Sequence, residues 1–255
     1  MAKRPRRHRR WGIVVLMLGV VVIGGWLAIT SSDWITASFS QSQAEHSDAK
    51  KKSAPEDVNR VQLDVPLVNQ MDAPRLYNGC EIASLTMLFN YVNVDVTKNE
   101  LAAKLPSVPL DYGDGTHGNP NVGFVGDITG NNPGLGVYHG PIYKVAKTQT
   151  KQVKDLSGAS FKQVIRQLEK GRPVWTVTTV SFAPVDSMET WSTPQGDVDV
   201  TYDVHSVVIT GFDRDKQLIY INNPYGQKQQ AVDWDNFQAA YKQLGRQAIV
   251  LTLKA

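Results

Sequence analysis

The chain has 255 residues, of which 42% are hydrophobic, with one cysteine and a formal net charge of +3. Six of the basic residues lie within the first ten positions, so residues 11–255 carry a net charge of −3. This charge distribution argues against a nucleic-acid-binding domain, and the single cysteine rules out an internal disulfide.

The N-terminal thirty residues have the pattern of a membrane anchor. Residues 1–10 form a basic tail, and residues 11–30 contain no charged side chain. Twenty helical residues span roughly 30 Å, the thickness of the hydrocarbon core of a bilayer. Because basic flanks stay in the cytoplasm, we predict a single-pass membrane protein with an extracellular C-terminal part.

A cleaved signal peptide, which would make the protein secreted, is the alternative for this segment. Its apolar region would be unusually long, and no clear Ala-x-Ala cleavage site follows it, so an uncleaved signal anchor is favoured. Residues 31–60 are polar with few aliphatic side chains, which predicts a flexible stalk. The folded domain is expected over 61–255.

The first half of this domain has helical signals and a glycine-rich segment. Residues 62–67 alternate and predict an edge strand, because Pro66 cannot donate to a central ladder. A helix is expected from Cys80, followed by a short helix that begins at a Thr97–Glu100 capping box. Nine glycines interrupt residues 111–140, which we interpret as a long loop that walls a cleft.

The second half has the signals of an antiparallel sheet. A capping box at Ser160 starts a helix that ends at Gly171. Expected strands are 174–180, 205–212, 218–222 and 248–253, with a loop or hairpin insertion at 181–203, a turn at 223–226 and a helix around 237–244. Helices first and antiparallel strands later predict the α+β class.

The only cysteine and one distant histidine suggest a nucleophile and its base. Cys80 follows an Asn-Gly turn at a helix start, where the helix dipole stabilises a thiolate. His205 opens a predicted strand and could supply an imidazolium, which would lower the pKa of the thiol further. Taken alone, Cys80 could be a small buried hydrophobic residue and His205 a core histidine.

Two amide side chains extend this pattern. Gln70 precedes the cysteine and could hold an oxyanion together with the backbone N–H of Cys80. Asn223 follows the predicted partner strand of His205 and could fix the tautomer of the imidazole. The order Gln, Cys, His, Asn is that of papain-type peptidases.

Over residues 61–251 the sequence resembles the C39-like cysteine peptidase family, in its exported branch of stand-alone domains. The segments that carry the resemblance are 65–70, 78–85, 118–126, 136–138, 171–175, 205–213 and 221–226. The resemblance implies a papain-like fold, with Cys80 as nucleophile on a helix, His205 as base on a sheet, Asn223 as orienting residue and Gln70 in the oxyanion hole. It implies a peptide or protein substrate, including cell-wall peptide, and no cofactor.

One residue departs from the family pattern. The family usually has Asp before this proline, and the chain has Asn223, which removes a negative charge that would stabilise an imidazolium. Three hypotheses therefore stand: a surface thiol hydrolase that cleaves peptide bonds (with a wall-peptide amidase or endopeptidase as a variant), a catalytically silent binding module, and a metal site. The metal site would use Cys80, His117, His139 and His205, but none of these has the close spacing of a ligand pair.

Overall fold

The computed structural model describes residues 58–253. The predicted basic tail, the predicted anchor and nearly all of the predicted stalk lie outside these residues. Within 58–253, no helix is both long and apolar enough to cross a membrane. The stalk prediction extended to residue 60, but Arg60 already belongs to the first strand of the domain.

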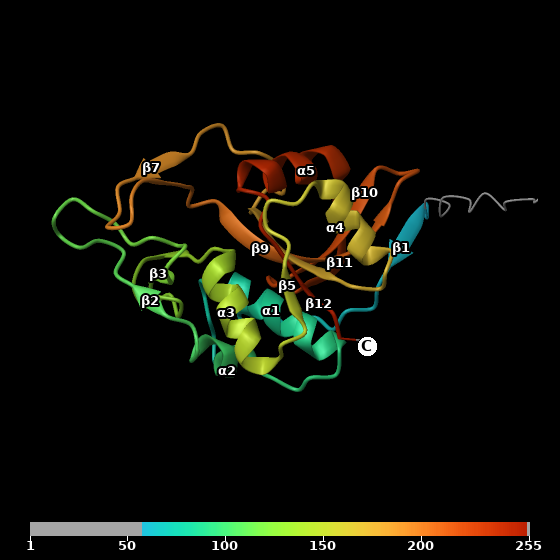
Figure 1. The fold of residues 1–255 in the computed structure, drawn as a ribbon, viewed down its shortest axis with the longest axis horizontal. Helices are drawn as coiled ribbons and strands as arrows, with labels where there is room; N and C mark the ends of the chain where they lie inside the picture. The colour runs from blue at the N-terminus through green and yellow to red at the C-terminus, as the bar shows by residue number, and fades with distance from the viewer. Residues whose placement is uncertain (1–57, 254–255) are drawn as a thin grey trace, which may run out of the picture. The chain divides into compact units, whose positions relative to one another are not determined.

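A seven-stranded sheet is the centre of the domain (Figure 1). Its strand order is β11-β10-β9-β6-β12-β5, with β1 paired to β9, and all of its pairs are antiparallel. The strands are β1 (Arg60–Gln62), β5 (Val153–Asp155), β6 (Val174–Thr179), β9 (Val204–Asp213), β10 (Leu218–Asn223), β11 (Gln227–Asp233) and β12 (Ala248–Leu251). The predicted antiparallel α+β arrangement is thereby confirmed.

Helices cover both faces of this sheet (Figure 1). They are α1 (Cys80–Tyr91), α2 (Lys98–Ala102), α3 (His139–Gln149), α4 (Phe161–Leu168) and α5 (Trp234–Gln243). Along β12, Ile249 and Leu251 pack into the core that contains α1 and α3, whereas Ala248 and Val250 pack into the core that contains α4 and α5. Because both faces are covered, the central strands are buried along their length and lack a solvent-exposed face.

The local sequence signals explain where two helices begin. Thr97 and Glu100 form the expected capping box at α2, in which the Thr97 N–H donates to the Glu100 carboxylate over 2.8 Å. Ser160 and Gln163 form the capping box at α4, in which the Ser160 N–H donates to the side-chain oxygen of Gln163, also over 2.8 Å. These caps supply partners for backbone N–H groups that a helix start leaves free.

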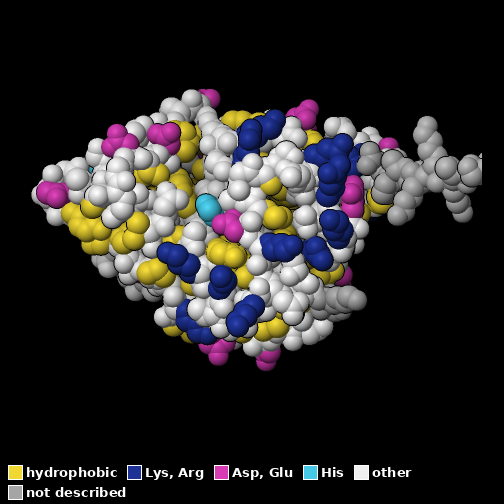
Figure 2. Space-filling view, viewed as in Figure 1, with side chains coloured by type: hydrophobic (Ala, Val, Ile, Leu, Met, Phe, Trp, Pro, Cys, Tyr) yellow, Lys and Arg dark blue, Asp and Glu magenta, His cyan; other side chains and the backbone are white. Residues whose placement is uncertain are grey.

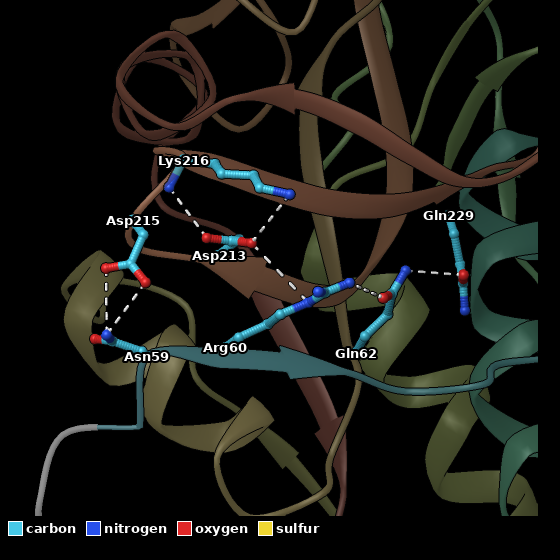
Figure 3. A network of polar contacts seen from close by, with 7 residues as sticks. All are labelled: Asn59, Arg60, Gln62, Asp213, Asp215, Lys216 and Gln229. Atoms are coloured by element: carbon cyan, nitrogen blue, oxygen red, sulfur yellow. Dashed lines mark hydrogen bonds and ion pairs between the residues drawn. The ribbon is translucent and has the colours of Figure 1, made fainter.

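The predicted strand at 62–67 is shorter and begins earlier than expected. β1 ends at Gln62, and only the Leu63 N–H continues the pairing, with the carbonyl of Thr210 at 2.8 Å. Polar side chains fix this strand at its outer end, where Asn59 donates to Asp215 and Arg60 lies 4.0 Å from Asp213 (Figure 3). Pro66 lies beyond the strand, so it removes no ladder hydrogen bond.

The glycine-rich segment has more regular structure than its sequence suggests. Residues 111–140 contain β3 (Phe124–Gly126) and β4 (Gly134–Gly136), which form a small sheet with β2 (Ser107–Val108). The insertion at 181–203, expected to be a loop or a hairpin, contains a hairpin of β7 (Glu189–Trp191) and β8 (Val198–Val200). α3 was not predicted, because Gly140 and Pro141 in its first turn conceal the helical pattern.

The segment that contains α3, β5 and α4 is rich in basic side chains, which the net charge of the chain does not reveal. Residues 144–172 include eight basic side chains and only two acidic ones. Figure 2 shows Lys and Arg side chains spread over the face that carries α3, β5 and α4. The basic residues are Lys144, Lys147, Lys151, Lys154, Lys162, Arg166, Lys170 and Arg172.

The contact between β1 and β9 requires a glycine at position 211. A Cβ there would overlap the carbonyl oxygen of Val61 and lie 2.9 Å from the Cα of Gln62. We expect Gly211→Ala to lower the free energy of unfolding by about 1–3 kcal/mol, the range typical of overpacking. In Gly140→Ala the new Cβ meets its nearest atom at 3.6 Å, so this control should be neutral or slightly stabilising. Urea denaturation of both variants tests this, and equal midpoints would contradict the prediction.

Candidate active site

A tight turn places Cys80 at the start of α1. Gly79 is the N-cap residue and makes no side-chain cap hydrogen bond. A Cβ on Gly79 would lie 2.5 Å from the Cβ of Leu76, so the chain can approach itself this closely only at a glycine. The turn therefore leaves the first N–H groups of the helix beside Cys80 without a side-chain cap.

Two buried hydrogen bonds fix the first turns of α1 to the sheet. The indole N–H of Trp175 on β6 donates to the carbonyl of Glu81 over 2.9 Å, and the Ser84 hydroxyl donates to the carbonyl of Ser206 on β9 over 3.1 Å. The thiol of Cys80 also interacts with the backbone of Ser206, the residue that follows His205. The helix start therefore lies against the end of β9 that carries the histidine.

An amide side chain sets the tautomer of His205. The ring Nε2 lies 3.0 Å from the Oδ1 of Asn223. The Nδ2 of Asn223 donates to the side-chain oxygens of Gln227 and Gln230, so its Oδ1 must face the ring. Nε2 therefore carries the proton, and Nδ1 keeps its lone pair. Nδ1 is buried and makes no hydrogen bond within residues 58–253, including none to the thiol.

Tyr225 covers the histidine and was not predicted from the sequence. Its ring stacks on the imidazole at 4.8 Å between centroids and 9° between planes, and half of the side chain is exposed. Its backbone N–H donates to the Oδ1 of Asn223 over 3.1 Å. The only sequence signal for this role is its position two residues after Asn223, within the turn.

Gln70 connects the segment before Cys80 with the turn after Asn223. It is fully buried, its Nε2 donates to the carbonyl of Tyr77 over 2.7 Å, and its backbone N–H donates to the carbonyl of Pro224 over 2.9 Å. Its Oε1 has no hydrogen-bond partner in the part of the chain that the structure describes. The contacts of Gln70, Cys80, His205 and Asn223 thus bring the four predicted residues into one region of the molecule.

The other two histidines of the metal hypothesis have partners elsewhere. His117 stacks on Trp191 at 4.4 Å, and the Nδ1 of His139 lies 2.7 Å from a carboxylate oxygen of Asp155. Among residues 58–253, no group of three or more His, Cys, Asp or Glu side chains could hold a metal ion.

A family model described as the Peptidase_C39 like family matches residues 62–249. The chain belongs to this family. It is 48% identical over 245 residues to "Uncharacterized protein YvpB" of Bacillus subtilis (strain 168), covering 94% of this chain and 96% of that protein. It also matches the crystal structure of a "putative C39-like peptidase" from Bacillus anthracis, with a TM-score of 0.72, 37% identity and coverage of 78% of this chain and 100% of the other.

The electrostatics of Cys80 differ from the expectation for a helix start. Burial raises the pKa of the thiol well above its ordinary value, and the neighbouring Glu81 carboxylate raises it further. The backbone N–H groups of Ser206 and Glu81 oppose this effect without reversing it. In this C39-like domain, desolvation therefore outweighs the backbone N–H groups at the helix start, and the pKa of the thiol is raised where the sequence predicted that it would be lowered.

His205 is held in its neutral form by the same cause. Burial lowers the pKa of the imidazole to about 4, although the hydrogen bond to Asn223 acts in the opposite direction. At pH 7 the site accordingly holds a thiol and a neutral imidazole, which differs from a preformed ion pair.

Glu81 is a third buried titratable group and was missing from the predicted site. Its side chain is 1% exposed, and burial raises the pKa of its carboxyl to about 7. An acidic residue in the first turn usually signals an exposed side chain that favours the helix dipole, so its sequence position concealed this role.

The neutral amide at position 223 generates a prediction about His205. In Asn223→Asp, a carboxylate next to Nε2 is expected to raise the pKa of His205 from about 4 by about 1 to 3, since a close opposite charge favours the imidazolium. Gln227 and Gln230 can rotate their amides and donate to the new oxygen.

The NMR shift of the His205 ring proton against pH measures this pKa. Asn236→Asp adds the same charge at an exposed position of α5 and serves as the control. A pKa of His205 that is equal in the two variants would show that residue 223 does not act on the ring.

Proposed function

We propose that the protein is a membrane-anchored extracellular thiol hydrolase that cleaves peptide bonds, on a papain-like fold, with a Cys80–His205–Asn223 triad. The observation that carries this proposal is the 3.0 Å contact of His205 Nε2 with Asn223. It leaves a buried Nδ1 with a free lone pair, which is the form a general base needs.

The reaction would proceed in two halves. As the sulfur of Cys80 bonds to the substrate carbonyl carbon, its proton moves to the Nδ1 of His205, and the carbonyl oxygen becomes an oxyanion. The oxyanion would accept from the Cys80 backbone N–H and from the second N–H of the Gln70 amide. When the tetrahedral intermediate collapses, the C–N bond breaks, the amine takes the proton from Nδ1, and a thioester remains.

Water completes the second half. His205 Nδ1 takes a proton from water as its oxygen attacks the thioester carbon, and the proton then passes to the departing Cys80 sulfur. Asn223 would keep Nε2–H in place throughout and stabilise the positive ring that forms twice in the cycle. Because both groups are neutral at rest, His205 would act as a general base during the attack.

A cleft beside the helix start supports a peptide substrate. It has a volume of about 430 Å³ and is lined by Tyr77, Asn78, residues 130–134 and Tyr202. Tyr77 and Asn78 immediately precede the Gly79–Cys80 turn, so a chain bound in this cleft would pass next to the nucleophile. Its lining has no charged side chain, which suits an uncharged stretch of peptide, including a cell-wall peptide.

Anchoring at the membrane rests on the uncharged segment 11–30 and the basic tail before it. Cell fractionation followed by protease treatment of intact cells tests this proposal. The full-length chain should sediment with membranes, and external protease should remove its C-terminal domain. A full-length chain in the culture medium, or a domain protected from protease, would contradict it.

A catalytically silent binding module of the same fold is the second candidate. It is favoured by the raised pKa of a thiol in a residue that is only 7% exposed, and by the low pKa of His205. Such a module would use the same cleft to hold peptide without forming a thioester.

Alkylation of the sole thiol distinguishes the two candidates. In a hydrolase, iodoacetamide should label Cys80 by a base-assisted route that weakens at least tenfold in His205→Ala, because general-base assistance typically contributes 10²–10⁴-fold. Hydrolysis of a quenched fluorescent peptide library and of wall stem peptides should disappear in both His205→Ala and Cys80→Ser. If the labelling rate is the same in His205→Ala as in the wild type, and no hydrolysis is detected, the hydrolase is contradicted and the binding module is supported.

Gln70 provides a separate test of the oxyanion hole. Gln70→Ala is expected to lower kcat by about 10²–10³-fold, the usual loss for one oxyanion donor, while KM changes little. Gln152→Ala removes the same side chain at an exposed position and should leave both constants unchanged. A rise in KM with unchanged kcat would assign Gln70 to substrate binding instead.

A further inference from the structure

The carboxyl group of Glu81 is held in a fixed orientation next to the nucleophile. Its Oε1 accepts the backbone N–H of Val137 over 2.9 Å. Gly136 makes room for this oxygen, because a Cβ at position 136 would lie 2.5 Å from Oε1. Its Oε2 is buried and has no hydrogen-bond partner in residues 58–253.

This orientation decides where a proton on Glu81 must be. Oε1 faces an N–H donor and cannot carry a hydrogen there, so the acid form has its proton on Oε2. The carboxyl and the thiol of Cys80 interact through their side chains and affect one another's pKa. The acid form therefore has a donor on the one oxygen that has no partner among residues 58–253, in the carboxyl group that interacts with the Cys80 side chain.

We propose that Glu81 is a further catalytic residue, whose neutral carboxyl donates a hydrogen bond from Oε2 to the Cys80 sulfur as the thiolate forms. This inference rests on the thiol hydrolase function proposed above and adds to it the requirement for a protonated acid. The proton of the thiol still moves to His205 Nδ1, and Glu81 keeps its own proton throughout. No further reactant is needed, since the carboxyl only shares its hydrogen with the developing charge.

Ionisation of Glu81 reverses its effect on the nucleophile. The carboxylate cannot donate, and its negative charge next to the sulfur opposes thiolate formation. Burial raises the pKa of Glu81 from 4.5 to about 7, so the donating form predominates below pH 7 and is lost above it. The reactive state, with Glu81 protonated and the thiol proton on His205, therefore loses population once the pH exceeds about 7.

Few other titratable groups lie near Glu81. On its own helix the neighbour is Cys80, and from the turn after β10 it is Tyr225, whose pKa Glu81 raises. The β9 residue that packs there is the apolar Val204, and the titratable His205 follows it in the strand. From β6, the residue in contact is Trp175, whose indole is neutral. The segment between β4 and α3 contributes the uncharged backbone of Val137. None of these supplies a cation that would keep Glu81 ionised.

The alkylation rate of Cys80 against pH, from pH 5 to 10, tests this inference. Cys80 is the only thiol in the 255 residues, so every adduct reports on this site. In the wild-type protein the assisted rate should be nearly constant between pH 5 and 7, because the thiol proton moves to His205 and is not lost to solvent, and it should fall as Glu81 ionises above pH 7. This first measurement needs no variant, so it does not depend on whether a mutant folds.

Glu81→Gln provides the decisive comparison. The Val137 N–H should hold the amide oxygen, which places the Nε2 donor where Oε2–H was. The variant should keep its assisted rate constant through pH 7 and react about tenfold faster than wild type, or more, at pH 8.5. Glu189→Gln, at an exposed position, should match the wild type. Above pH 7 the decline in kcat/KM should likewise disappear in Glu81→Gln alone.

The opposite results would overturn the inference. A wild-type rate that does not fall above pH 7, or a Glu81→Gln profile equal to or slower than that of the wild type, would assign Glu81 a structural role. The His205→Ala experiment reports separately on the hydrolase. If His205→Ala abolishes assisted alkylation while Glu81→Gln changes nothing, only the role of Glu81 fails.

Discussion

Burial at the start of α1 is the constraint on which the site depends. A thiol, an imidazole and a carboxyl group lose most of their water in the same place, and each is thereby driven towards its neutral form. The helix dipole and two backbone N–H groups act on the sulfur in the other direction, but they are weaker than the loss of solvent. The site is thus a neutral cluster whose charges must be created during a reaction, when substrate has entered.

The scaffold provides this burial from both sides of the helix. The main sheet fixes the first turns of α1 through Trp175 and Ser84, and the glycine-rich segment closes over Glu81 through Gly136 and Val137. Glycines are needed there because backbone must approach a carboxyl oxygen more closely than any Cβ would allow. The segment that the sequence presents as a long loop is therefore one wall of the site.

The sequence predicted those parts of the molecule whose cause is local. The capping boxes at Thr97 and Ser160, the turn before Cys80 and the strand that begins beside His205 all follow from neighbouring residues, and the structure has each of them. α3 and the strands of the glycine-rich segment were missed because tertiary packing stabilises them against weak local propensity. Glu81 and Tyr225 were missed for a related reason: their roles depend on contacts with Val137 and His205, which are distant in the sequence.

The neutral cluster also gives a physical reason for an amide at position 223. With Asp there, a carboxylate would raise the pKa of His205 and, through the imidazolium, favour a thiolate at rest. With Asn223, the thiol of Cys80 and the imidazole of His205 stay uncharged at rest. In the proposed reaction, the thiol proton moves to Nδ1 only as the sulfur attacks a substrate carbonyl carbon. Under the proposed function, a thiol that remains protonated between turnovers is less exposed to oxidation, because the thiolate is the form that oxidants attack. On this argument, Asn223 and the raised pKa of Cys80 are compatible with an active enzyme. The proposed hydrogen bond from Glu81 would stabilise the thiolate in place of the negative charge that an Asp at position 223 would bring.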